Sequence, residues 1–215
     1  MTNKELADLL LPGVSSDIEF YEKKYPKRNL SEKAIVTRFA PSPTGFVHMG
    51  SLFASFIEKK AANDTDGVFY LRIEDTDQKR EVENGVTGII NDLKNFDITI
   101  DEGMISETEG KGEYGPYIQS QRKEIYQTYV KHLIEEGLAY PCFCSHEQIE
   151  ETRQIQEKRK QRIGYYGRFA VCRRLTPEDI KAKVEAGEPY IIRFKSMGDH
   201  NNKIFFHDEI KGDLE

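Results

Sequence analysis

Apolar residues recur with two different periods along the first half of the chain. Ala34–Phe39 is a short apolar run typical of a strand, and it ends at a loop, Ala40–Val47, that is rich in proline and glycine. Between Met49 and Ala62 the apolar residues have helical spacing, and Val68–Ile73 and Glu81–Phe96 predict a second strand and a second helix. Because two strands joined through a crossover helix are parallel, the pattern predicts an α/β fold.

The pattern changes after Asp101. A glycine-rich, acidic stretch, Asp101–Gly115, precedes an amphipathic helix near Ser120–Glu136 and a cysteine-bearing strand or turn at Tyr140–Cys144. Two more helices and two more strands are predicted beyond it, at His146–Arg162, Pro177–Ala186, Tyr190–Lys195 and Lys203–His207. The second half is therefore expected to form a separate α+β unit, joined to the first near residues 102–115.

The first 33 residues carry two short helix-like patterns. These lie around Lys4–Leu10 and Ser16–Lys24, and Pro12 and Pro26 interrupt them. Such short helices cannot bury a core of their own, so residues 1–33 are interpreted as an amino-terminal extension packed on something larger.

Composition narrows the class of protein. The 31 Lys and Arg residues against 37 Asp and Glu residues give a net charge of −6, which removes any argument for nucleic-acid binding from overall charge and leaves only a local basic patch. No run approaches the roughly 20 apolar residues that span a bilayer. The amino terminus lacks the basic flank of a secretion signal. We expect a cytoplasmic protein without a membrane segment.

The three cysteines are an odd set for a disulfide framework. Cys142 and Cys144 are separated by one residue, and Cys172 follows later in the chain. In a cytoplasmic protein this pattern favours a metal site or free thiols over disulfides.

The loop after the first strand has the features of a phosphate site. Pro41, Pro43 and Gly45 lie in the loop, and the run His48–Ser51 (HMGS) opens the following helix. A helix amino terminus offers unpaired N–H groups and a partial positive charge, and Gly50 would let a nucleotide approach the backbone closely. An imidazole there can donate a hydrogen bond to a phosphate oxygen as charge develops. The alternative is a proline-rich turn followed by a surface histidine.

Three ordered sequence blocks resemble a known family. Arg38–Gly45 (RFAPSPTG) with the HMGS run, then Leu71–Asp77 (LRIEDTD) and Gly115–Arg122 (GPYIQSQR), are similar to signatures of bacterial glutamyl-tRNA synthetases, which are class I aminoacyl-tRNA synthetases. The resemblance runs from about Ile35 to the end of the sequence and includes Phe206–Gly212 (FHDEIKG).

The resemblance implies a fold and a division of the chain. Residues 34–113 would form the first half of a class I Rossmann-like nucleotide-binding fold, after the extension at 1–33. Residues 114–215 would form an inserted α+β subdomain that binds the tRNA acceptor end. In some members of the family this insertion contains zinc. We expect the protein to act as a monomer.

The resemblance also implies residues for the first reaction step. ATP, arriving with Mg²⁺, would meet Pro41, Ser42, His48, Gly50 and Ser51, with His48 and Gly50 at the reacting phosphate. L-Glutamate would be bound by Arg38, Ala40, Ser42 and Glu74. A guanidinium suits a carboxylate, and the Glu74 carboxylate suits the substrate ammonium. Positioning and charge stabilisation then allow glutamyl-adenylate to form without a side-chain nucleophile.

The later blocks imply a tRNA and a metal site. The 3′ end of tRNA-Glu would contact Tyr117, Gln119, Ser120 and Arg122, by stacking and by cations on phosphates. In some glutamyl-tRNA synthetases and their tRNA-modifying relatives, zinc in this insertion is bound by a Cys-x-Cys, a Tyr and a third Cys, which correspond here to Cys142, Cys144, Tyr166 and Cys172. Tyr166 precedes Cys172 by two residues more than in the family pattern, so His146 is a competing ligand. Three buried thiols without metal are the alternative.

Some parts of the expected active site are missing from the sequence. Nothing in Lys203–Glu215 resembles the lysine loop that binds the triphosphate, and we find no anticodon-binding domain. The expectation is an amino-terminal fragment that does not form glutamyl-adenylate alone. Two alternatives stay open: the paralogue that glutamylates queuosine on tRNA-Asp, against which residues 1–33 argue, and a non-catalytic module that binds a tRNA acceptor end.

Overall fold

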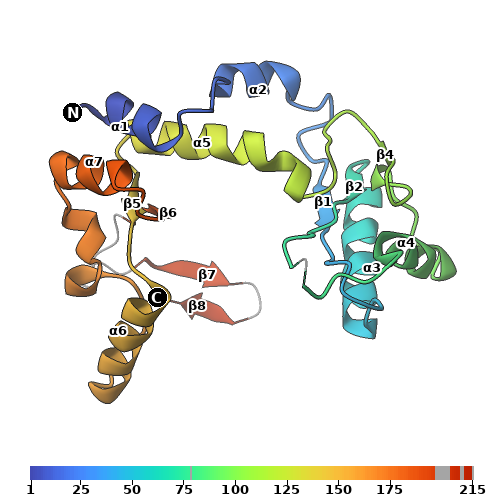
Figure 1. The fold of residues 1–215 in the computed structure, drawn as a ribbon. Coiled ribbons are helices and arrows are strands. Elements are labelled where there is room, and N and C mark those ends of the chain that lie inside the picture. The colour runs from blue at the N-terminus through green and yellow to red at the C-terminus, as the bar shows by residue number, and fades with distance from the viewer. Residues whose placement is uncertain (78, 197–203, 209–210, 215) are drawn as a thin grey trace. The chain divides into compact units, whose positions relative to one another are not determined.

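The structure is a computed structural model that describes residues 1–77, 79–196, 204–208 and 211–214. The chain forms two compact units. One consists of residues 16–128, and the other of residues 1–15 together with residues 129–215. Along the sequence, the division between 128 and 129 falls within helix α5 (Lys123–Glu135), which is labelled in Figure 1.

A four-stranded sheet organises residues 16–128. Strand β1 (Val36–Phe39) pairs in parallel with β2 (Val68–Leu71), and β2 pairs in parallel with β3 (Glu102–Met104). A short β4 (Gly110–Lys111) closes the sheet antiparallel to β3, so the order is β1-β2-β3-β4. The parallel pairing confirms the α/β class predicted from the alternation of strands and helices.

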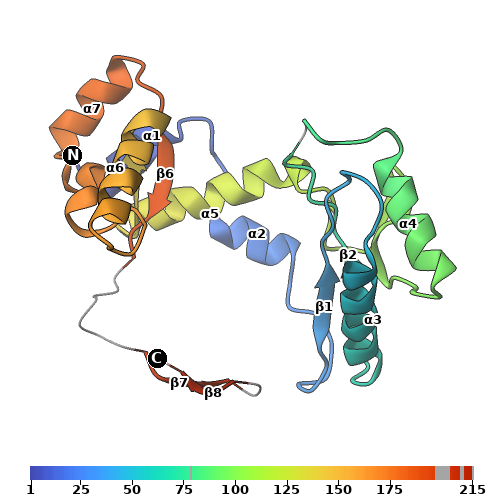
Figure 2. The same cartoon turned by 90° about the horizontal axis from the view of Figure 1, so that it is seen from below.

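Helices connect and cover these strands. Helix α3 (Met49–Asn63) links β1 to β2 and runs alongside both of them (Figure 2), and α4 (Gly85–Asn95) links β2 to β3. Helix α2 (Ile18–Lys24) precedes the sheet, and the 3-10 turn η1 (Ser120–Arg122) leads into α5. Apolar side chains from the strands and from both connecting helices form one buried core, which includes Phe39, Leu52, Phe69, Leu71, Ile73, Ile89 and Leu93.

Three elements of this unit, β3, β4 and α4, differ from the sequence-based prediction. Strands β3 and β4 lie in the glycine-rich stretch Asp101–Gly115, where the sequence pattern predicts no strand because the glycines hide the apolar alternation. Gly103 has φ +118°, and a Cβ atom on it would lie 2.2 Å from the Leu71 carbonyl oxygen. Only glycine can therefore pair with β2 at this position. Helix α4 begins at Gly85 instead of Glu81, after Asn84 in the left-handed conformation with φ 56°.

The other unit joins the start of the chain to its second half. Helix α1 (Asn3–Leu10) packs with α7 (Pro177–Glu185), and the Tyr190 hydroxyl donates to the Leu10 carbonyl at 2.7 Å. Strands β5 (Ala139–Cys142) and β6 (Ile191–Phe194) pair antiparallel. Its buried core consists of Ala7, Leu10, Ile134, Ala139 and Ile180.

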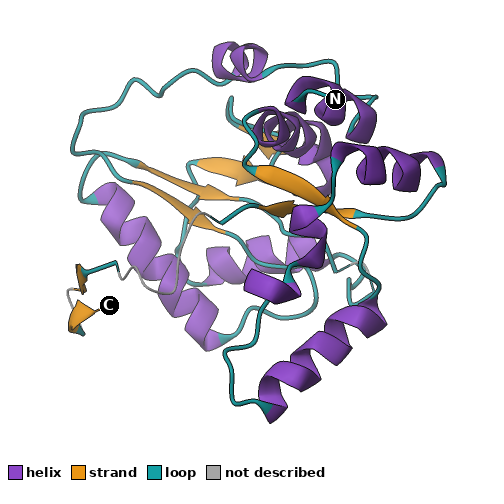
Figure 3. Cartoon of the chain, turned by 90° about the vertical axis from the view of Figure 1, so that its left-hand side faces the viewer, coloured by secondary structure: helices purple, strands orange, loops and turns teal. Residues whose placement is uncertain are grey.

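Helix α6 (His146–Lys158) is shorter than predicted. Ser145 caps it with a capping box, and it ends before Lys160, whose φ of 53° cannot continue a helix. Figure 3 distinguishes helices, strands and loops along the chain. The remaining elements are the 3-10 turns η2 (Gly167–Phe169) and η3 (Val171–Arg174) and the hairpin of β7 (Phe206–Asp208) with β8 (Gly212–Leu214). Lys203, the predicted start of the last strand, lies outside the described residues.

The compact units follow other boundaries than the predicted functional parts. The extension at 1–33 is shared, because residues 1–15 contact the second half while residues 16–33 belong with the sheet. The predicted boundary at 113/114 lies within the sheet unit, since Tyr117 and its neighbours pack against the core of the sheet. The assignment of residues 34–113 and 114–215 to nucleotide and tRNA binding stays a prediction.

Within the described residues, no helix combines the length and the apolar character needed to cross a membrane.

Candidate functional site

Two oppositely charged side chains meet at the carboxyl ends of the parallel strands. Arg38 lies in β1 and Glu74 follows β2, and Arg38 Nη1 lies 3.7 Å from Glu74 Oε1. Arg72 Nη2 donates to the same oxygen at 3.1 Å. The Arg38 and Glu74 side chains are 40% and 31% exposed, so both can still reach a ligand. A guanidinium and a carboxylate side by side can bind the two charged ends of an amino acid.

The backbone continues the parallel pairing beyond the strand ends. Arg72 N donates to the Phe39 carbonyl at 3.0 Å, and Glu74 N donates to the Pro41 carbonyl at 2.9 Å. These bonds tie the segment that carries Glu74 to the start of the loop after β1. The position of Glu74 is therefore set by main-chain contacts.

The loop after β1 and the start of α3 enclose a cavity of about 320 Å³. His48 is the N-cap residue of α3, with an extended backbone and without a side-chain capping bond, and its side chain is exposed. A Cβ atom on Gly50 would meet nothing within 4 Å, so the space beside this backbone is open. The residues that line the cavity are Pro41, Ser42, Thr44, Gly45, Phe46, Val47, His48 and Ser51.

The loop is anchored from its other side by α4 and by the residues just before this helix. Val82 N donates to the Pro43 carbonyl at 3.0 Å, and Val47 N donates to Asp92 Oδ2 at 3.2 Å. A Cβ atom on Gly85 would lie 2.8 Å from the Pro43 carbonyl oxygen, so this close approach needs glycine. The structure thus brings the predicted ATP residues Pro41, Ser42, His48 and Ser51 around one cavity, and Gly50 lies beside them on α3. We call these residues, with Arg38, Ala40 and Glu74, the edge site.

Sequence reasoning missed one further acidic residue near Arg38. Glu58 lies on α3, and its backbone carbonyl accepts a hydrogen bond from the Thr37 hydroxyl at 2.8 Å. Burial raises the pKa of Glu58, against the opposing effect of the Arg38 charge. The helical pattern carried no signal for this position, because the contact depends on how α3 packs on β1.

The four residues predicted to contact tRNA lie together but differ in exposure. Tyr117 is only 4% exposed, and its hydroxyl donates to Glu102 at 2.9 Å, so its ring is not free to stack on a base in this conformation. Ser120 binds Asp75 through both its N–H, at 2.8 Å, and its hydroxyl. Arg122 donates to the Pro116 carbonyl at 2.9 Å. The contact with tRNA stays a prediction for all four residues, Tyr117, Gln119, Ser120 and Arg122.

The three cysteines come together in the other unit. The sulfur atoms of Cys142, Cys144 and Cys172 all lie within 4.8 Å of one another. Cys142 ends β5, Cys144 follows that strand, and Cys172 comes from η3 in a separate part of the chain. The Tyr165 hydroxyl lies 3.3 Å from the Cys142 sulfur and 3.2 Å from the Cys144 sulfur. We call these four residues the cysteine cluster.

Tyr165, and not Tyr166, is the tyrosine of this cluster. The Tyr166 hydroxyl instead donates to the Arg162 carbonyl four residues earlier. The two tyrosines are adjacent, so their side chains leave the backbone in different directions and only one can face the thiols. His146 does not belong to the cluster either. Among the described residues, the group of His, Cys, Asp and Glu side chains that could hold a metal ion consists of the three cysteines.

The pKa values of Cys142 and Cys144 are shifted in opposite directions. Burial raises the pKa of Cys142, but hydrogen bonds from Tyr165 and Arg193 outweigh it and lower the value to about 7. Burial raises the pKa of Cys144 to about 11. Burial and the nearby sulfur atoms also raise the pKa of Tyr165. The cluster is therefore a compact set of one readily ionised thiol, two further thiols and a phenol.

Comparison with known proteins decides the family. The profile of the family described as "tRNA synthetases class I (E and Q), catalytic domain" matches residues 34–215. The chain belongs to this class I synthetase family. It has the mixed α/β fold with a parallel sheet of the Rossmann-like amino-terminal region of these synthetases.

Individual synthetases match the chain over most or all of its length. "Glutamate--tRNA ligase" of Clostridium beijerinckii is 50% identical over 214 residues, and that of Acetivibrio thermocellus is 49% identical over 215 residues; each match covers 100% of this chain and 39% of the relative. A crystal structure of a glutamate tRNA ligase from Elizabethkingia meningosepticum in complex with its amino acid matches with a TM-score of 0.70 and 34% identity, over 85% of this chain and 36% of that one. The chain thus spans well under half the length of these synthetases.

Proposed function

We propose that this chain supplies the part of a glutamate–tRNA ligase that binds glutamate and ATP. The observation that carries the proposal is the edge site, where Arg38 and Glu74 lie side by side and the Glu74 N–H binds the carbonyl of Pro41, which lines the cavity at the start of α3. The names of the relatives support the same reaction. The proposed reaction joins L-glutamate to tRNA-Glu through glutamyl-adenylate.

Arg38 and Glu74 suit the two charged groups of the amino acid. The guanidinium of Arg38 would bind a carboxylate of glutamate, and Glu74 would bind its ammonium group. Arg38 and Arg72 both lie near Glu74, and their ion pairs hold its carboxylate beside the start of the loop. Ala40 and Ser42 would line the path of the bound amino acid where the loop leaves β1.

The cavity at the start of α3 suits a nucleotide phosphate. The free N–H groups at the amino end of α3 and the dipole of this helix favour negative charge, and Gly50 leaves open space for a phosphate to approach the backbone closely. The carboxylate of glutamate would attack the α-phosphorus of ATP, which arrives with Mg²⁺, and pyrophosphate would leave. His48 would donate a hydrogen bond to a phosphate oxygen as its charge increases. A ribose hydroxyl at the 3′ end of tRNA-Glu would then take the glutamyl group, near Gln119, Ser120 and Arg122.

We also propose that the cysteine cluster binds a structural zinc ion. Zinc in proteins is four-coordinate and accepts sulfur and oxygen ligands. Three thiols and one phenol already converge here, and the pKa of Cys142 near 7 favours a thiolate. Bound zinc would link β5 to the turn before α7 and contribute to folding.

A chimera tests the proposed reaction. The matching residues of the Clostridium beijerinckii relative are replaced by this chain, and glutamate-dependent exchange between ATP and pyrophosphate is measured together with glutamylation of tRNA-Glu. We expect both activities, and we expect Arg38→Gln and Glu74→Gln to remove the exchange while leaving the melting temperature unchanged.

The matched control is Arg153→Gln, which removes an exposed cation of α6 outside the edge site. It should leave both activities unchanged. A folded chimera that catalyses no exchange, beside an active parent enzyme, would contradict the proposed function. Equal exchange with glutamine as substrate would contradict the choice of amino acid.

A further inference from the structure

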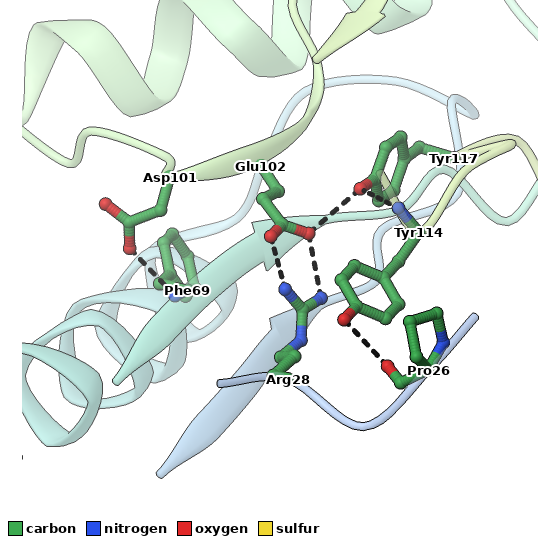
Figure 4. A network of polar contacts seen from close by, with 7 residues as sticks. All are labelled: Pro26, Arg28, Phe69, Asp101, Glu102, Tyr114 and Tyr117. Atoms are coloured by element: carbon green, nitrogen blue, oxygen red, sulfur yellow. Dashed lines mark hydrogen bonds and ion pairs between the residues drawn. The ribbon is translucent and has the colours of Figure 1, made fainter. Parts of the chain in front are cut away.

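An ion pair connects the amino-terminal extension to the sheet. Arg28 binds Glu102 of β3 with both ends of its guanidinium, and the Nη2–Oε2 distance is 2.8 Å (Figure 4). The two side chains are only 17% and 16% exposed. The family profile begins at residue 34, so Arg28 lies before the residues that the profile matches, although the relatives from Clostridium beijerinckii and Acetivibrio thermocellus match the whole chain.

Arg28 and its neighbour Pro26 also enclose the loop before η1. The Arg28 guanidinium lies 3.7 Å from the centre of the Tyr114 ring, and the Tyr114 hydroxyl donates to the Pro26 carbonyl at 2.8 Å. Figure 4 shows Arg28 beside Tyr114 and pointing toward Glu102. The extension therefore contacts both the sheet and the loop that follows it.

Glu102, which binds Arg28, also binds Tyr117. The Tyr117 hydroxyl donates to Glu102 Oε2 at 2.9 Å and accepts from the Tyr114 N–H at 3.1 Å. With both hydrogen-bonding capacities used and the ring buried, Tyr117 has one defined position.

The backbone of Tyr117 adjoins the segment that carries Glu74. Ile73 N donates to the Tyr117 carbonyl at 2.9 Å, and Gln119 N donates to the Ile73 carbonyl at 2.9 Å. Glu74 is the next residue, and Asp75 after it accepts from Ser120. An unbroken series of contacts thus leads from Arg28 through Glu102 and Tyr117 to the predicted glutamate-binding carboxylate.

We propose that Arg28 is a positioning residue for the glutamate subsite: by pairing with Glu102 it fixes Tyr117, whose backbone sets the position of Ile73 and Glu74. The inference rests on the proposed function, since it takes Glu74 as a contact of the substrate. It gives the extension a role in substrate binding, although no residue of the extension lies in the edge site. Replacing Arg28 leaves the Glu102 carboxylate without its cation in a mostly buried place, so the network is expected to rearrange.

The test uses the full chain labelled with ¹⁵N. Amide hydrogen exchange is followed at Ile73 and Gln119, and the dissociation constant for L-glutamate is taken from the shift of the Glu74 amide signal. In Arg28→Met we expect exchange at these two amides to accelerate by about tenfold or more, and glutamate to bind about tenfold more weakly. For Arg28→Lys, both the exchange rates and the glutamate affinity should lie between those of wild type and Arg28→Met, because lysine keeps the positive charge but cannot form the two parallel hydrogen bonds.

Two further variants separate positioning from general stability. Lys27→Met changes the exposed neighbouring cation and should alter neither measurement. Tyr117→Phe removes one hydroxyl without an unpaired charge, and should reproduce the faster exchange at Ile73 and Gln119 with a smaller loss of melting temperature. If Arg28→Met lowers the melting temperature but accelerates all amides equally and leaves glutamate affinity unchanged, the inference is wrong.

The proposed function can fail separately. If the Glu74 amide signal does not shift with L-glutamate in the wild-type protein, and does not shift in an active chimera either, the proposed glutamate subsite is wrong. Glutamate binding by wild type with unchanged affinity in Arg28→Met overturns only the role of Arg28.

Discussion

The edge site and the cysteine cluster hold their polar groups in different ways. In the edge site, Arg38 and His48 are exposed, and main-chain hydrogen bonds set their positions. In the cysteine cluster, Cys142 and Cys172 are buried, and the side chains contact one another directly. The difference implies that substitutions in the edge site should change reaction rates with little loss of stability, whereas substitutions in the cluster should do the reverse.

The largest expected effect is on the stability of the cysteine cluster. Cys172→Ala removes one of three converging thiols, so the protein should lose bound zinc. With zinc at about a thousandfold excess over its dissociation constant, the loss in the free energy of unfolding is about 4 kcal/mol. Denaturant unfolding with and without a chelator measures it. A chelator should lower the free energy of unfolding of the wild-type protein and leave that of the variant almost unchanged. If the unfolding curves of the wild-type protein are the same with and without the chelator, the cluster consists of three thiols without metal.

The ion pair that supports the edge site should give a pH-dependent effect. Burial raises the pKa of Glu102, but hydrogen bonds from Arg28 and Tyr117 outweigh it, so the pKa lies below its ordinary value of 4.5. A carboxyl group with a lowered pKa stabilises the fold above its unfolded pKa, and this contribution is lost as the pH falls through the folded value. Arg28→Met should therefore cost about 3 kcal/mol at pH 7, and the difference from wild type should shrink below pH 4.5.

Thermal or denaturant unfolding of the two proteins across this pH range is the measurement. Lys27→Met should give a curve parallel to wild type at every pH. A difference between wild type and Arg28→Met that stays constant down to pH 3 would show that Glu102 is not the group whose charge Arg28 compensates.

A smaller free-energy effect, visible only in the rate, is expected at His48. Because its side chain is exposed and makes no capping bond, His48→Ala should leave the melting temperature within about a degree. Loss of a hydrogen-bond donor to the developing phosphate charge should reduce ATP–pyrophosphate exchange in the chimera by about 100-fold, or about 2.7 kcal/mol. Asp64→Asn, an exposed change at the other end of α3, is the control. Unchanged exchange in His48→Ala would remove His48 from the reaction.

The smallest effect distinguishes the two adjacent tyrosines. Tyr165→Phe should weaken zinc binding by about tenfold, or about 1.4 kcal/mol, because one oxygen ligand is lost. Tyr166→Phe, the matched control, loses only its bond to the Arg162 carbonyl and should bind zinc like wild type. Competition with a chromophoric chelator gives both affinities. The opposite ranking would restore Tyr166 as the ligand.

Much of the edge site could be predicted because its residues are close in sequence. Arg38 through Ser51 form one strand, loop and helix start, so a motif read along the chain also describes neighbours in space. Glu74 follows the next parallel strand, and the carboxyl ends of parallel strands meet at one edge. Strands β3 and β4 escaped prediction, because Gly103 is required by the close approach of Leu71 and carries no apolar side chain.

The sequence by itself determined the alternation of strands and helices and the parallel sheet, because periodicity and strand direction are local properties, and its resemblance to a known family singled out Arg38, His48 and Glu74. Only the tertiary structure decided that Tyr165 faces the thiols, that Tyr117 is buried, and that Arg28 pairs with Glu102, 74 positions away in the chain. Contacts over such separations depend on which faces of distant elements pack together, and no local pattern encodes that choice.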